Sequence, residues 1–334
     1  MHIQNNVSLK DFSTMRLGGL AHSLTTVTTV DELGEAVSWA QQHNLPILVL
    51  GGGSNVIFSD GYPGLVIVNN ITGFDAINDT TIRIGAGENW DAAVKRTVDM
   101  GLHGIEFLSA IPGTAGATPV QNVGAYGAQI SDVFVELQAF DLQSHTIVTL
   151  SKADCGFTYR NSIFKSPKNR RYIITSITLQ LSKQLPVPPF YASLQRYLDE
   201  NNITDYTPQT IRHAVVAIRA VKLPDPRKIA NTGSFFKNPI VPSELATTLL
   251  QTYPTMPHWD APQNTVKLAA GWLIEQAGLK NYRAHGMATY EHHALVLVNE
   301  HANTYADLAA FRQEIIDAVR AQFGVTLEQE PELL

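Results

Sequence analysis

A run of three glycines between two apolar segments limits the folds that this chain of 334 residues can adopt. The stretch VLGGGSNVIF (49–58) has the pattern of a strand, a glycine turn and a second strand. A Rossmann fold requires GxGxxG at the entrance to a helix, and a P-loop requires GK[ST]; this stretch contains neither motif. Glycines after a strand let backbone N–H groups approach a phosphate, so a tight turn and a phosphate site both remain open.

A second glycine-rich stretch, EFLSAIPGTAGATPVQNVGAYG (106–127), is longer. Its glycines lie among small residues, and Pro112 restricts the backbone. Gln121, Asn122 and Tyr126 add side-chain donors and acceptors. Long loops without secondary structure of their own are usually functional. The two glycine-rich stretches together predict a large nucleotide held across two subdomains, rather than a purely structural role.

Helical and strand patterns alternate along the rest of the chain. Apolar spacing and end signals predict helices over 31–44, 88–101, 207–222, 265–278 and 304–324. Strands are predicted at 45–51, 81–87, 171–181 and 293–300, and a β-hairpin at 133–150. A proline-rich stretch over 185–198 has the pattern of a loop followed by a short helix. The last hundred or so residues therefore form a second α/β unit, and there is no internal repeat.

Composition indicates a folded protein of two or three domains. With 44% hydrophobic and 16% charged residues, the chain is not disordered, and its net charge of -6 argues against general nucleic-acid binding. Cys155 is the single cysteine, which excludes an internal disulfide, and its flanks favour a structural role. The amino-terminal residues lack the apolar core of a signal peptide, and no apolar run reaches the roughly 18 residues of a membrane helix. We therefore expect a cytoplasmic protein that contacts neither membranes nor nucleic acid.

The eleven histidines show no metal-ligand spacing. His292 and His293 precede the apolar segment ALVLV, and we interpret them as a surface pair at a strand entrance rather than as metal ligands. We expect no metal.

The stretch NTGSFFKNP (231–239) places Ser234 between a glycine and two phenylalanines. One interpretation is a turn, because Gly233 permits unusual dihedral angles and Pro239 ends the element that follows. The other is that Ser234 faces a reacting centre from which Phe235 and Phe236 exclude water. These residues alone do not decide between the two.

Eight motifs make the chain resemble the UDP-N-acetylenolpyruvoylglucosamine reductases, the flavoenzymes that make UDP-N-acetylmuramate for bacterial cell walls. The motifs are GGGSNVIF (51–58), GAGENW (85–90), IPGTAGATPVQNVGAYG (111–127), FTYRNSIFK (157–165), KLPDP (222–226), GSFFKNP (233–239), KLAAGWLIEQAGLK (267–280) and LEQE (327–330). They keep the order of the family and cover nearly the whole chain. The loop VPPFYASL (187–194) resembles the substrate-covering loop of the longer subclass of this family.

This resemblance implies an α+β fold: a two-lobed FAD-binding region of the vanillyl-alcohol-oxidase type and an α/β substrate-binding domain. We place the lobes at 1–70 and 71–223, the substrate-binding domain at 224–324, and a tail over 325–334 that returns to the second lobe. The glycine stretches then provide the FAD contacts, which are Gly51, Gly52, Gly53, Ser54, Asn55, Pro112, Gly113, Gly116, Ala117, Gln121, Asn122, Gly124, Ala125, Tyr126 and Gly127.

The resemblance also implies a reaction. NADPH reduces FAD, reduced FAD gives a hydride to C3 of the enolpyruvyl group of UDP-N-acetylglucosamine enolpyruvate, and a proton reaches C2. Negative charge moves toward the conjugated carboxylate, so the site needs a cation there and a proton donor at the carbon. Arg160 matches the carboxylate-binding arginine, Glu330 the acidic partner and Ser234 the proton donor, which favours the second interpretation of NTGSFFKNP.

For the diphosphate and the sugar, the matching residues are Tyr191, Lys222 and Asn238, and Tyr159 is either a substrate contact or packing. The chain departs from the family at its end, EPELL, where relatives continue with a short strand that contains an arginine. Pro331 cannot donate a ladder hydrogen bond, so we expect this strand to be absent or shortened, with Glu328 and Glu332 as alternatives to Glu330.

Two other functions remain open, an FAD-dependent oxidase on the same fold and a non-catalytic sugar-nucleotide-binding protein. The oxidase has no need of GSFFKNP or LEQE, and the binding protein has no need of Ser234 or Arg160. The expected partners are small molecules only, and the expected oligomeric state is a monomer.

Overall fold

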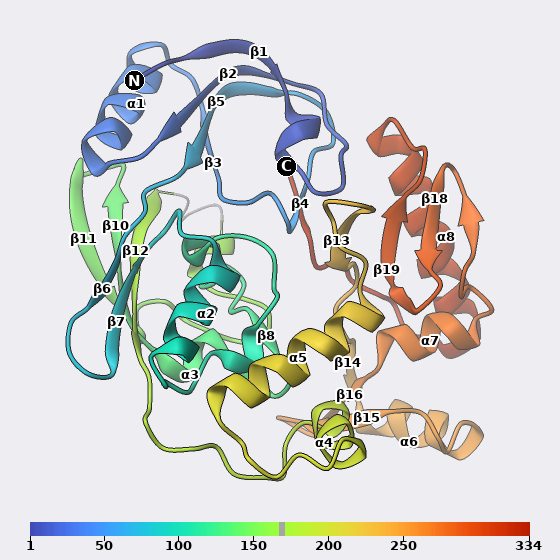
Figure 1. Cartoon of the computed structure of the whole chain (residues 1–334). Helices are drawn as coiled ribbons and strands as arrows, with labels where there is room; N and C mark the ends of the chain where they lie inside the picture. The colour runs from blue at the N-terminus through green and yellow to red at the C-terminus, as the bar shows by residue number, and fades with distance from the viewer. Residues whose placement is uncertain (167–170) are drawn as a thin grey trace. The chain divides into compact units, whose positions relative to one another are not determined.

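The computed structural model describes residues 1–166 and 171–334 and has the mixed α and β composition that the sequence predicts (Figure 1). The chain forms two compact units, each built from three separate segments. Unit 1 consists of Met1–Val7, Ala21–Gly53 and Tyr62–Ala220, and unit 2 of Ser8–Leu20, Ser54–Gly61 and Val221–Leu334. Within the described residues, no helix combines the length and the apolar character that crossing a membrane requires.

The first sheet of unit 1 has the strand order β1-β2-β5-β3, formed by β1 (Gln4–Ser8), β2 (Leu20–Val27), β5 (Tyr62–Asn69) and β3 (Ile47–Leu50). The last three strands run parallel. Helix α1 (Val30–Gln42) begins where the Thr29 side chain accepts a hydrogen bond from the backbone N–H of Glu32. Its apolar face, which includes Leu33 and Val37, packs with Leu65 of β5 in one core. Strand β3 therefore ends directly before Gly51, so the sheet fixes the position at which the first glycine stretch begins.

The second sheet of unit 1 is antiparallel, in the order β11-β10-β12-β7-β6. Its strands are β6 (Phe74–Ala76), β7 (Thr81–Gly85), β10 (Phe134–Asp141), β11 (Thr146–Ser151) and β12 (Tyr172–Gln180). Helix α2 (Trp90–Asp99) begins at the Asn89 cap, and Trp90 is fully buried with residues of β7 and β12. Strands β10 and β11 pair as the hairpin predicted over 133–150.

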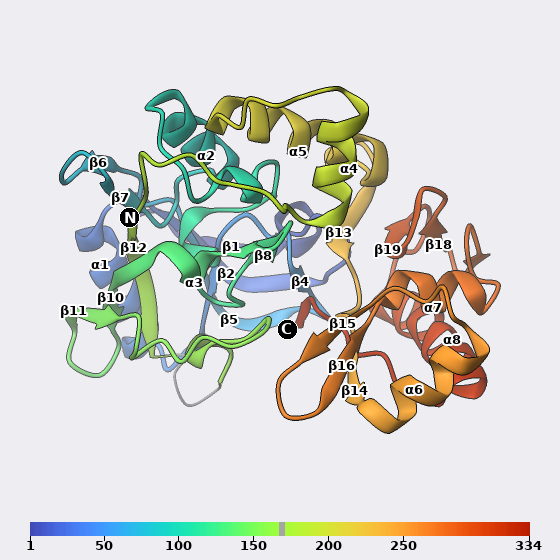
Figure 2. The ribbon, with the colours of Figure 1, turned by 90° about the horizontal axis from the view of Figure 1, so that it is seen from below.

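Short elements follow α2 in unit 1. Residues 106–127 contain two 3-10 turns, Glu106–Leu108 and Ala115–Ala117, and strand β8 (Gly124–Ala125), which pairs with β9 (Ala128–Gln129) ahead of α3 (Ile130–Val133). Helices α4 (Ala192–Glu200) and α5 (Pro208–Lys222) lie side by side (Figure 2), with Leu194 and Leu198 of α4 packed against Ile211 and Val215 of α5. The proline-rich stretch is a loop up to Tyr191, as predicted, and α4 follows it.

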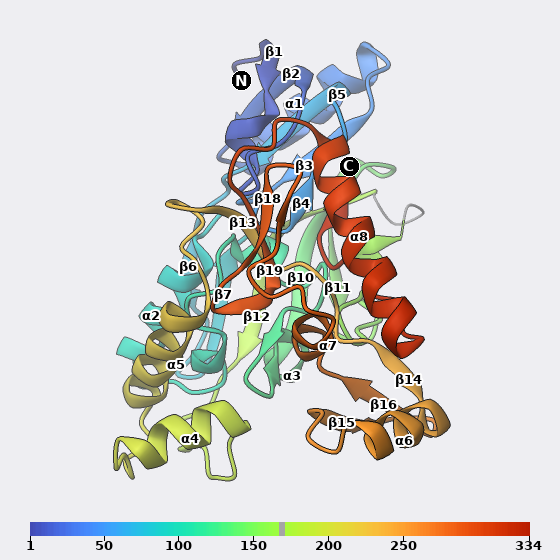
Figure 3. The ribbon, with the colours of Figure 1, turned by 90° about the vertical axis from the view of Figure 1, so that its right-hand side faces the viewer.

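Unit 2 contains a four-stranded antiparallel sheet in the order β13-β19-β18-β17. The strands are β13 (Ala230–Ser234), β17 (Arg283–Ala284), β18 (Met287–Tyr290) and β19 (His293–Asn299). The long helix α8 (Tyr305–Phe323) lies beside this sheet (Figure 3), and its buried Phe311 and Ile315 share a core with Leu297. The Thr304–Asp307 capping box begins α8, and Gly324 ends it in the left-handed conformation, as the sequence predicts.

A smaller sheet of unit 2 has the order β14-β16-β15, with β14 (Ile240–Pro242), β15 (His258–Ala261) and β16 (Thr265–Leu268) next to helix α6 (Ser243–Thr252). Here the prediction of one helix over 265–278 is wrong, because β16 occupies its first turn and α7 is confined to Ala270–Gln276. As the central strand, β16 gains backbone hydrogen bonds on both edges, and these outweigh the helical spacing of its apolar residues.

The chain end also differs from expectation. Residues 325–334, predicted to return to the second lobe, group with unit 2. Strand β20 (Glu332–Leu333) pairs in parallel with β4 (Val56–Ile57), so the strand that follows the LEQE motif is present but short.

Two further predictions concern single residues. Cys155 is completely buried, and burial together with Asp154 raises the pKa of its thiol to about 12, which agrees with a structural role. The surface pair His292–His293 is only half correct. His292 is exposed, whereas His293 is partly buried beside Gly271 of α7.

Candidate active site

In unit 1, the two glycine-rich stretches lie against each other. A Cβ atom on Gly52 would come within 2.9 Å of the Cα atom of Gly113, and one on Gly51 would overlap the hydroxyl of Thr114. Gly53 and Gly113 have φ angles of 61° and 118°, which a side chain would strain. Glycine is therefore required at these positions by the close approach of two backbones, and the surface that results presents main chain rather than side chains.

The GAGENW motif holds the second stretch in place. The backbone N–H of Trp90 donates to the carbonyl of Gly113 at 3.1 Å, and Ala115 N donates to the carbonyl of Glu88 at 2.9 Å. Gly116 packs so closely on Ala86 that an added Cβ would lie 2.5 Å from the Cβ of Ala86. Three of the eight motifs therefore meet in one part of unit 1, which explains why the sequence needs all three.

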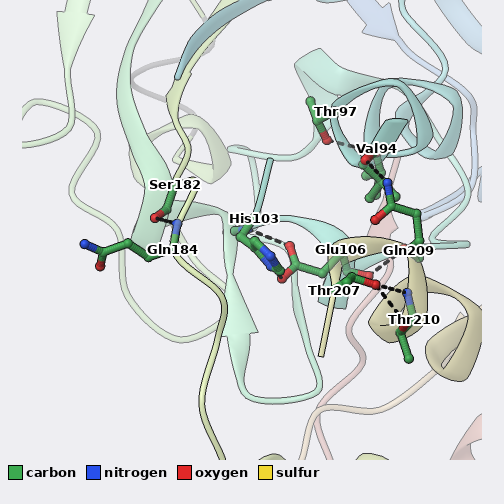
Figure 4. A network of polar contacts seen from close by, with 12 residues as sticks. Val94, Thr97, His103, Glu106, Ser182, Gln184, Thr207, Gln209 and Thr210 are labelled. Carbon is green, nitrogen blue, oxygen red and sulfur yellow. Dashed lines mark hydrogen bonds and ion pairs between the residues drawn. The ribbon is translucent and has the colours of Figure 1, made fainter. Parts of the chain in front are cut away.

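A buried polar network lies at the start of the second stretch (Figure 4). The Glu106 carboxylate is fully buried, with Oε1 3.0 Å from Nδ1 of His103, and its Oε2 accepts a hydrogen bond from the N–H of Gly104 at 2.6 Å. The Gln209 side chain of α5 donates to the carbonyl of Val98, which links α5 to the end of α2. Sequence reasoning missed this network, because a carboxylate inside a glycine-rich stretch gives no sign of its burial.

Asn122 is a structural member of the second stretch. Its side chain is 1% exposed; Nδ2 donates to Gln129 and to the carbonyl of Thr158, and Oδ1 accepts from the N–H of Ser131. Asn122 and Tyr126 both have positive φ angles, 47° and 50°. The amide of Asn122 thus fixes a strained turn and ties it to the FTYRNS motif.

Arg160 lies at the tip of a tight hairpin. Thr158 and Asn161 exchange backbone hydrogen bonds around it, and Arg160 has a φ of 51°. Its Nη2 donates to the carbonyl of Gly124 at 2.7 Å, and its guanidinium lies 5.4 Å from the centre of the Tyr159 ring. The hairpin therefore places the predicted carboxylate-binding arginine directly beside the second glycine stretch, with Tyr159 packed against it.

Tyr126 and Tyr191 also meet in unit 1, with ring centroids 6.1 Å apart and edge-to-face geometry. Arg219 of α5 hydrogen-bonds to Tyr126, and burial raises the pKa of Tyr126 although Arg219 lowers it. Burial also lowers the pKa of Arg219, partly offset by Tyr126 and Asp91.

Asp91 of α2 anchors α5 by accepting two hydrogen bonds from Arg212, at 2.5 and 2.9 Å. Sequence reasoning missed Arg212 and Arg219. Their spacing of seven residues on a predicted helix was the available signal, since it places both side chains on one face.

In unit 2, a β-bulge presents Ser234. The register of β13 against β19 shifts between Asn231 and Ser234, where Gly233 has a φ of 72° and donates to the Asn231 side chain at 2.8 Å. Ser234 is partly buried, whereas Phe235 and Phe236 are completely buried and contact each other edge to face. The glycine turn of the first interpretation is thus present, and the two buried phenylalanines anchor the chain directly after Ser234. That Ser234 faces a reacting centre remains a prediction.

The residues after Ser234 are held by their own partners. Nζ of Lys237 lies 3.2 Å from Oε2 of Glu328, and the Asn238 side chain accepts from the N–H of Ala270 at the start of α7. The pKa of His293 is lowered, first by burial and then by Lys222. Lys222 and His293 are therefore electrostatically coupled.

Glu330 is fixed by its backbone, since its N–H donates to the carbonyl of Phe235 at 2.9 Å. The structure thus brings Glu330 next to the Ser234 motif within unit 2. Unit 1 holds Gly51–Gly53, the second glycine stretch, Arg160, Tyr159 and Tyr191, and unit 2 holds Ser54, Asn55, Lys222, Ser234, Asn238 and Glu330. Within the described residues, no group of three His, Cys, Asp or Glu side chains is arranged to hold a metal ion.

Comparison with known proteins identifies relatives along the whole chain. A family model described as "UDP-N-acetylenolpyruvoylglucosamine reductase, C-terminal domain" matches residues 225–334, and a model described as "FAD binding domain" matches residues 22–151. The UDP-N-acetylenolpyruvoylglucosamine reductase of Ralstonia nicotianae is 41% identical over 326 residues, covering 96% of this chain and 95% of that protein. The enzyme of the same name from Neisseria gonorrhoeae is 41% identical over 337 residues, covering 99% of this chain and 97% of that protein.

A solved structure of UDP-N-acetylenolpyruvylglucosamine reductase from Thermus caldophilus matches this chain with a TM-score of 0.70 at 24% identity. The match covers 100% of this chain and 99% of the other, and it shows that the two share a fold. The predicted fold class, an α+β protein with an FAD-binding region, is thereby confirmed.

Proposed function

Because this chain belongs to the UDP-N-acetylenolpyruvoylglucosamine reductase family, we propose that it reduces UDP-N-acetylglucosamine enolpyruvate to UDP-N-acetylmuramate, a peptidoglycan precursor, with FAD and NADPH. The observation that carries the proposal is the position of Arg160. The guanidinium of Arg160 provides the positive charge that an enolpyruvyl carboxylate requires. It donates a hydrogen bond to the carbonyl of Gly124, which belongs to a glycine stretch that suits a flavin nucleotide. An oxidase on this fold has no need of that cation.

The glycine stretches fit FAD on structural grounds. They form a side-chain-free surface at Gly51, Gly52 and Gly116, where an added Cβ atom would collide with neighbouring atoms, and at Gly113, whose φ of 118° disfavours a side chain. Backbone N–H groups on such a surface are able to approach a pyrophosphate. When bound, FAD accepts the reducing equivalents of NADPH and supplies the hydride for C3 of the substrate. The contacts predicted from 51–55 and 112–127 remain part of this proposal.

Arg160 binds the substrate carboxylate and stabilises the enolate charge that develops on it. A guanidinium provides two parallel N–H donors for a carboxylate, and hydrogen bonds between ionised groups are stronger than neutral ones. The strained hairpin tip and the contact with Gly124 orient the guanidinium of Arg160 before the substrate binds. This reduces the reorganisation that the site needs during the reaction.

Ser234 donates the proton to C2. An alcohol is a weak acid, so this role requires a strongly basic carbanion in a positioned, water-poor site. The β-bulge provides the position, and the buried Phe235 and Phe236 prevent the backbone from moving. We assign to Glu330 the role of acidic partner, because its backbone is hydrogen-bonded to Phe235, the residue that follows the proton donor.

Tyr191, Lys222 and Asn238 bind the diphosphate and sugar, and Tyr159 supports Arg160. We further propose that the protein acts as a monomer in the cytoplasm. We also propose that it is divided by function into two FAD-binding lobes, over 1–70 and 71–223, and a substrate-binding domain over 224–324.

Anaerobic single turnover tests the function. The protein is reduced with NADPH and mixed with UDP-N-acetylglucosamine enolpyruvate while flavin absorbance is followed, for wild type, Ser234→Ala and the control Ser243→Ala. We expect rapid reoxidation in wild type and control, and a loss of about a hundred- to ten-thousandfold in Ser234→Ala. Reoxidation by oxygen but not by the enolpyruvyl substrate would indicate an oxidase instead, and a colourless protein that binds the substrate without flavin would indicate a sugar-nucleotide-binding protein.

A further inference from the structure

The last seven residues of unit 2, 328–334, form an extended run that we call the C-terminal segment. This segment changes its pairing partner halfway. The N–H of Lys237 donates to the carbonyl of Glu328, and Glu330 N donates to the carbonyl of Phe235, both at 2.9 Å. From Glu332 onward the partner is β4, because Glu332 N donates to the carbonyl of Asn55 at 2.9 Å.

Pro331 lies at the point of change and is buried. A proline has no N–H, so the segment has no backbone donor between Glu330 and Glu332. The N–H groups of Glu330 and Glu332 therefore donate to two different partners, and Pro331 between them has no N–H to donate.

The Gln329 side chain forms a bridge across this point. Its Nε2 donates to the carbonyl of Pro331 at 2.8 Å, while its Oε1 accepts from Nη1 of Arg312 at 2.9 Å. Arg312 lies on α8 next to the completely buried Phe311. A rigid helix is thereby connected, through two side chains, to the residues on both sides of Glu330.

Arg312 is partly buried, and within the residues that the structure describes its buried Nε atom has no hydrogen-bond partner. A buried donor without a partner is unfavourable for folding. The guanidinium at this position is thus poorly explained by stability alone, and its Nη1 atom donates to Gln329.

We propose that Arg312 and Gln329 are positioning residues that set the backbone orientation of Glu330 in the reduction. This inference rests on the proposed function, in which Glu330 is the acidic partner of Ser234. Gln329 donates to the carbonyl of Pro331, and Arg312 holds the Gln329 amide in the orientation that this hydrogen bond requires.

The test separates the two half-reactions of the intact, FAD-loaded protein. Arg312→Met and Gln329→Leu are compared with Arg320→Met, which removes an exposed arginine of the same helix that pairs with Asp317. We expect flavin reduction by NADPH to stay within about twofold of wild type in all three, and flavin reoxidation by the enolpyruvyl substrate to slow about ten- to a hundredfold in the first two only. Arg312→Lys, which keeps a donor, restores part of the rate.

A second measurement does not depend on activity. In the same variants, amide hydrogen exchange of the 328–334 peptide is expected to be at least several-fold faster than in wild type, with exchange of the α8 core unchanged. Equal slowing of both half-reactions, or unchanged exchange together with unchanged reoxidation, would overturn the proposal.

The Glu330→Gln background distinguishes this proposal from the proposed function. If Gln329 acts through Glu330, the double variant Glu330→Gln, Gln329→Leu is no slower than Glu330→Gln alone. Additive losses would overturn the positioning role and leave the role of Glu330 intact. Normal reoxidation in Glu330→Gln itself would overturn both assignments, while the Ser234→Ala result would still report on the reaction.

Discussion

At the residue scale, His293 makes the stability of unit 2 depend on pH. Burial, Lys222 and Lys280 lower its pKa from the usual histidine value of about 6.5, and Glu275 partly offsets them. The unfolded chain therefore binds a proton at a higher pH than the folded protein does. The stability that neutral His293 provides is complete above about pH 6.5 and is lost as pH falls toward the lowered pKa.

We accordingly expect the urea midpoint of wild type to fall between pH 7 and pH 5 more steeply than that of His293→Gln. His292→Gln is the matched control, because this neighbouring histidine is exposed. A slope in His293→Gln equal to that of wild type would show that other groups cause the acid sensitivity. Urea titrations at four pH values suffice for the comparison.

At the scale of the element, α8 depends on its first turn. The Thr304 hydroxyl and the Asp307 carboxylate each bond to the backbone of the other, and these bonds satisfy N–H groups that the helix itself leaves without acceptors. Thr304→Ala should lower the free energy of unfolding by about 1 kcal/mol. Thr248→Ala in α6 is the control, because its hydroxyl bonds back to the Glu244 carbonyl and caps nothing. Equal losses in both variants, measured by urea unfolding, would contradict the capping role.

At the scale of the whole molecule, unit 2 is not a continuous piece of chain. Met15, Leu17 and Ile57, all completely buried in its main core, come from Ser8–Leu20 and Ser54–Gly61, and β20 pairs with β4. An isolated fragment of residues 221–334 lacks these groups. We expect it to show helical circular dichroism but no cooperative thermal transition, because the core is left with cavities and an unpaired edge. A sharp transition in the fragment would show that the amino-terminal segments are dispensable.

The sequence predicted the local features of this protein well. The ends of α8 at Thr304 and Gly324 follow from local end signals, and the β10–β11 hairpin follows from alternation over neighbouring strands. Helix α1, expected over 31–44, is capped two residues earlier, at Thr29. The glycine stretches were also identifiable, because a backbone that must approach another backbone tolerates no side chain. The family resemblance then supplied roles that no spacing could supply.

The sequence did not predict the contacts between segments that lie far apart along the chain. The strand β16 interrupted a predicted helix because its two partner strands come from elsewhere in unit 2. His293 is partly buried by α7, and Glu106 is buried inside the second glycine-rich stretch, where its sequence gave no sign of burial. In each case the deciding partner lies on another element, which a local pattern does not identify.

By itself, therefore, the sequence determined which residues form helices, turns and glycine contacts, because those preferences depend on a side chain and its near neighbours. Only the tertiary structure decided that Ser8–Leu20 and Ser54–Gly61 complete unit 2, and that Gln329 bridges Arg312 to Pro331. Burial and hydrogen bonding between distant segments are set by the packing of the whole unit, where backbone donors must find acceptors wherever the fold places them.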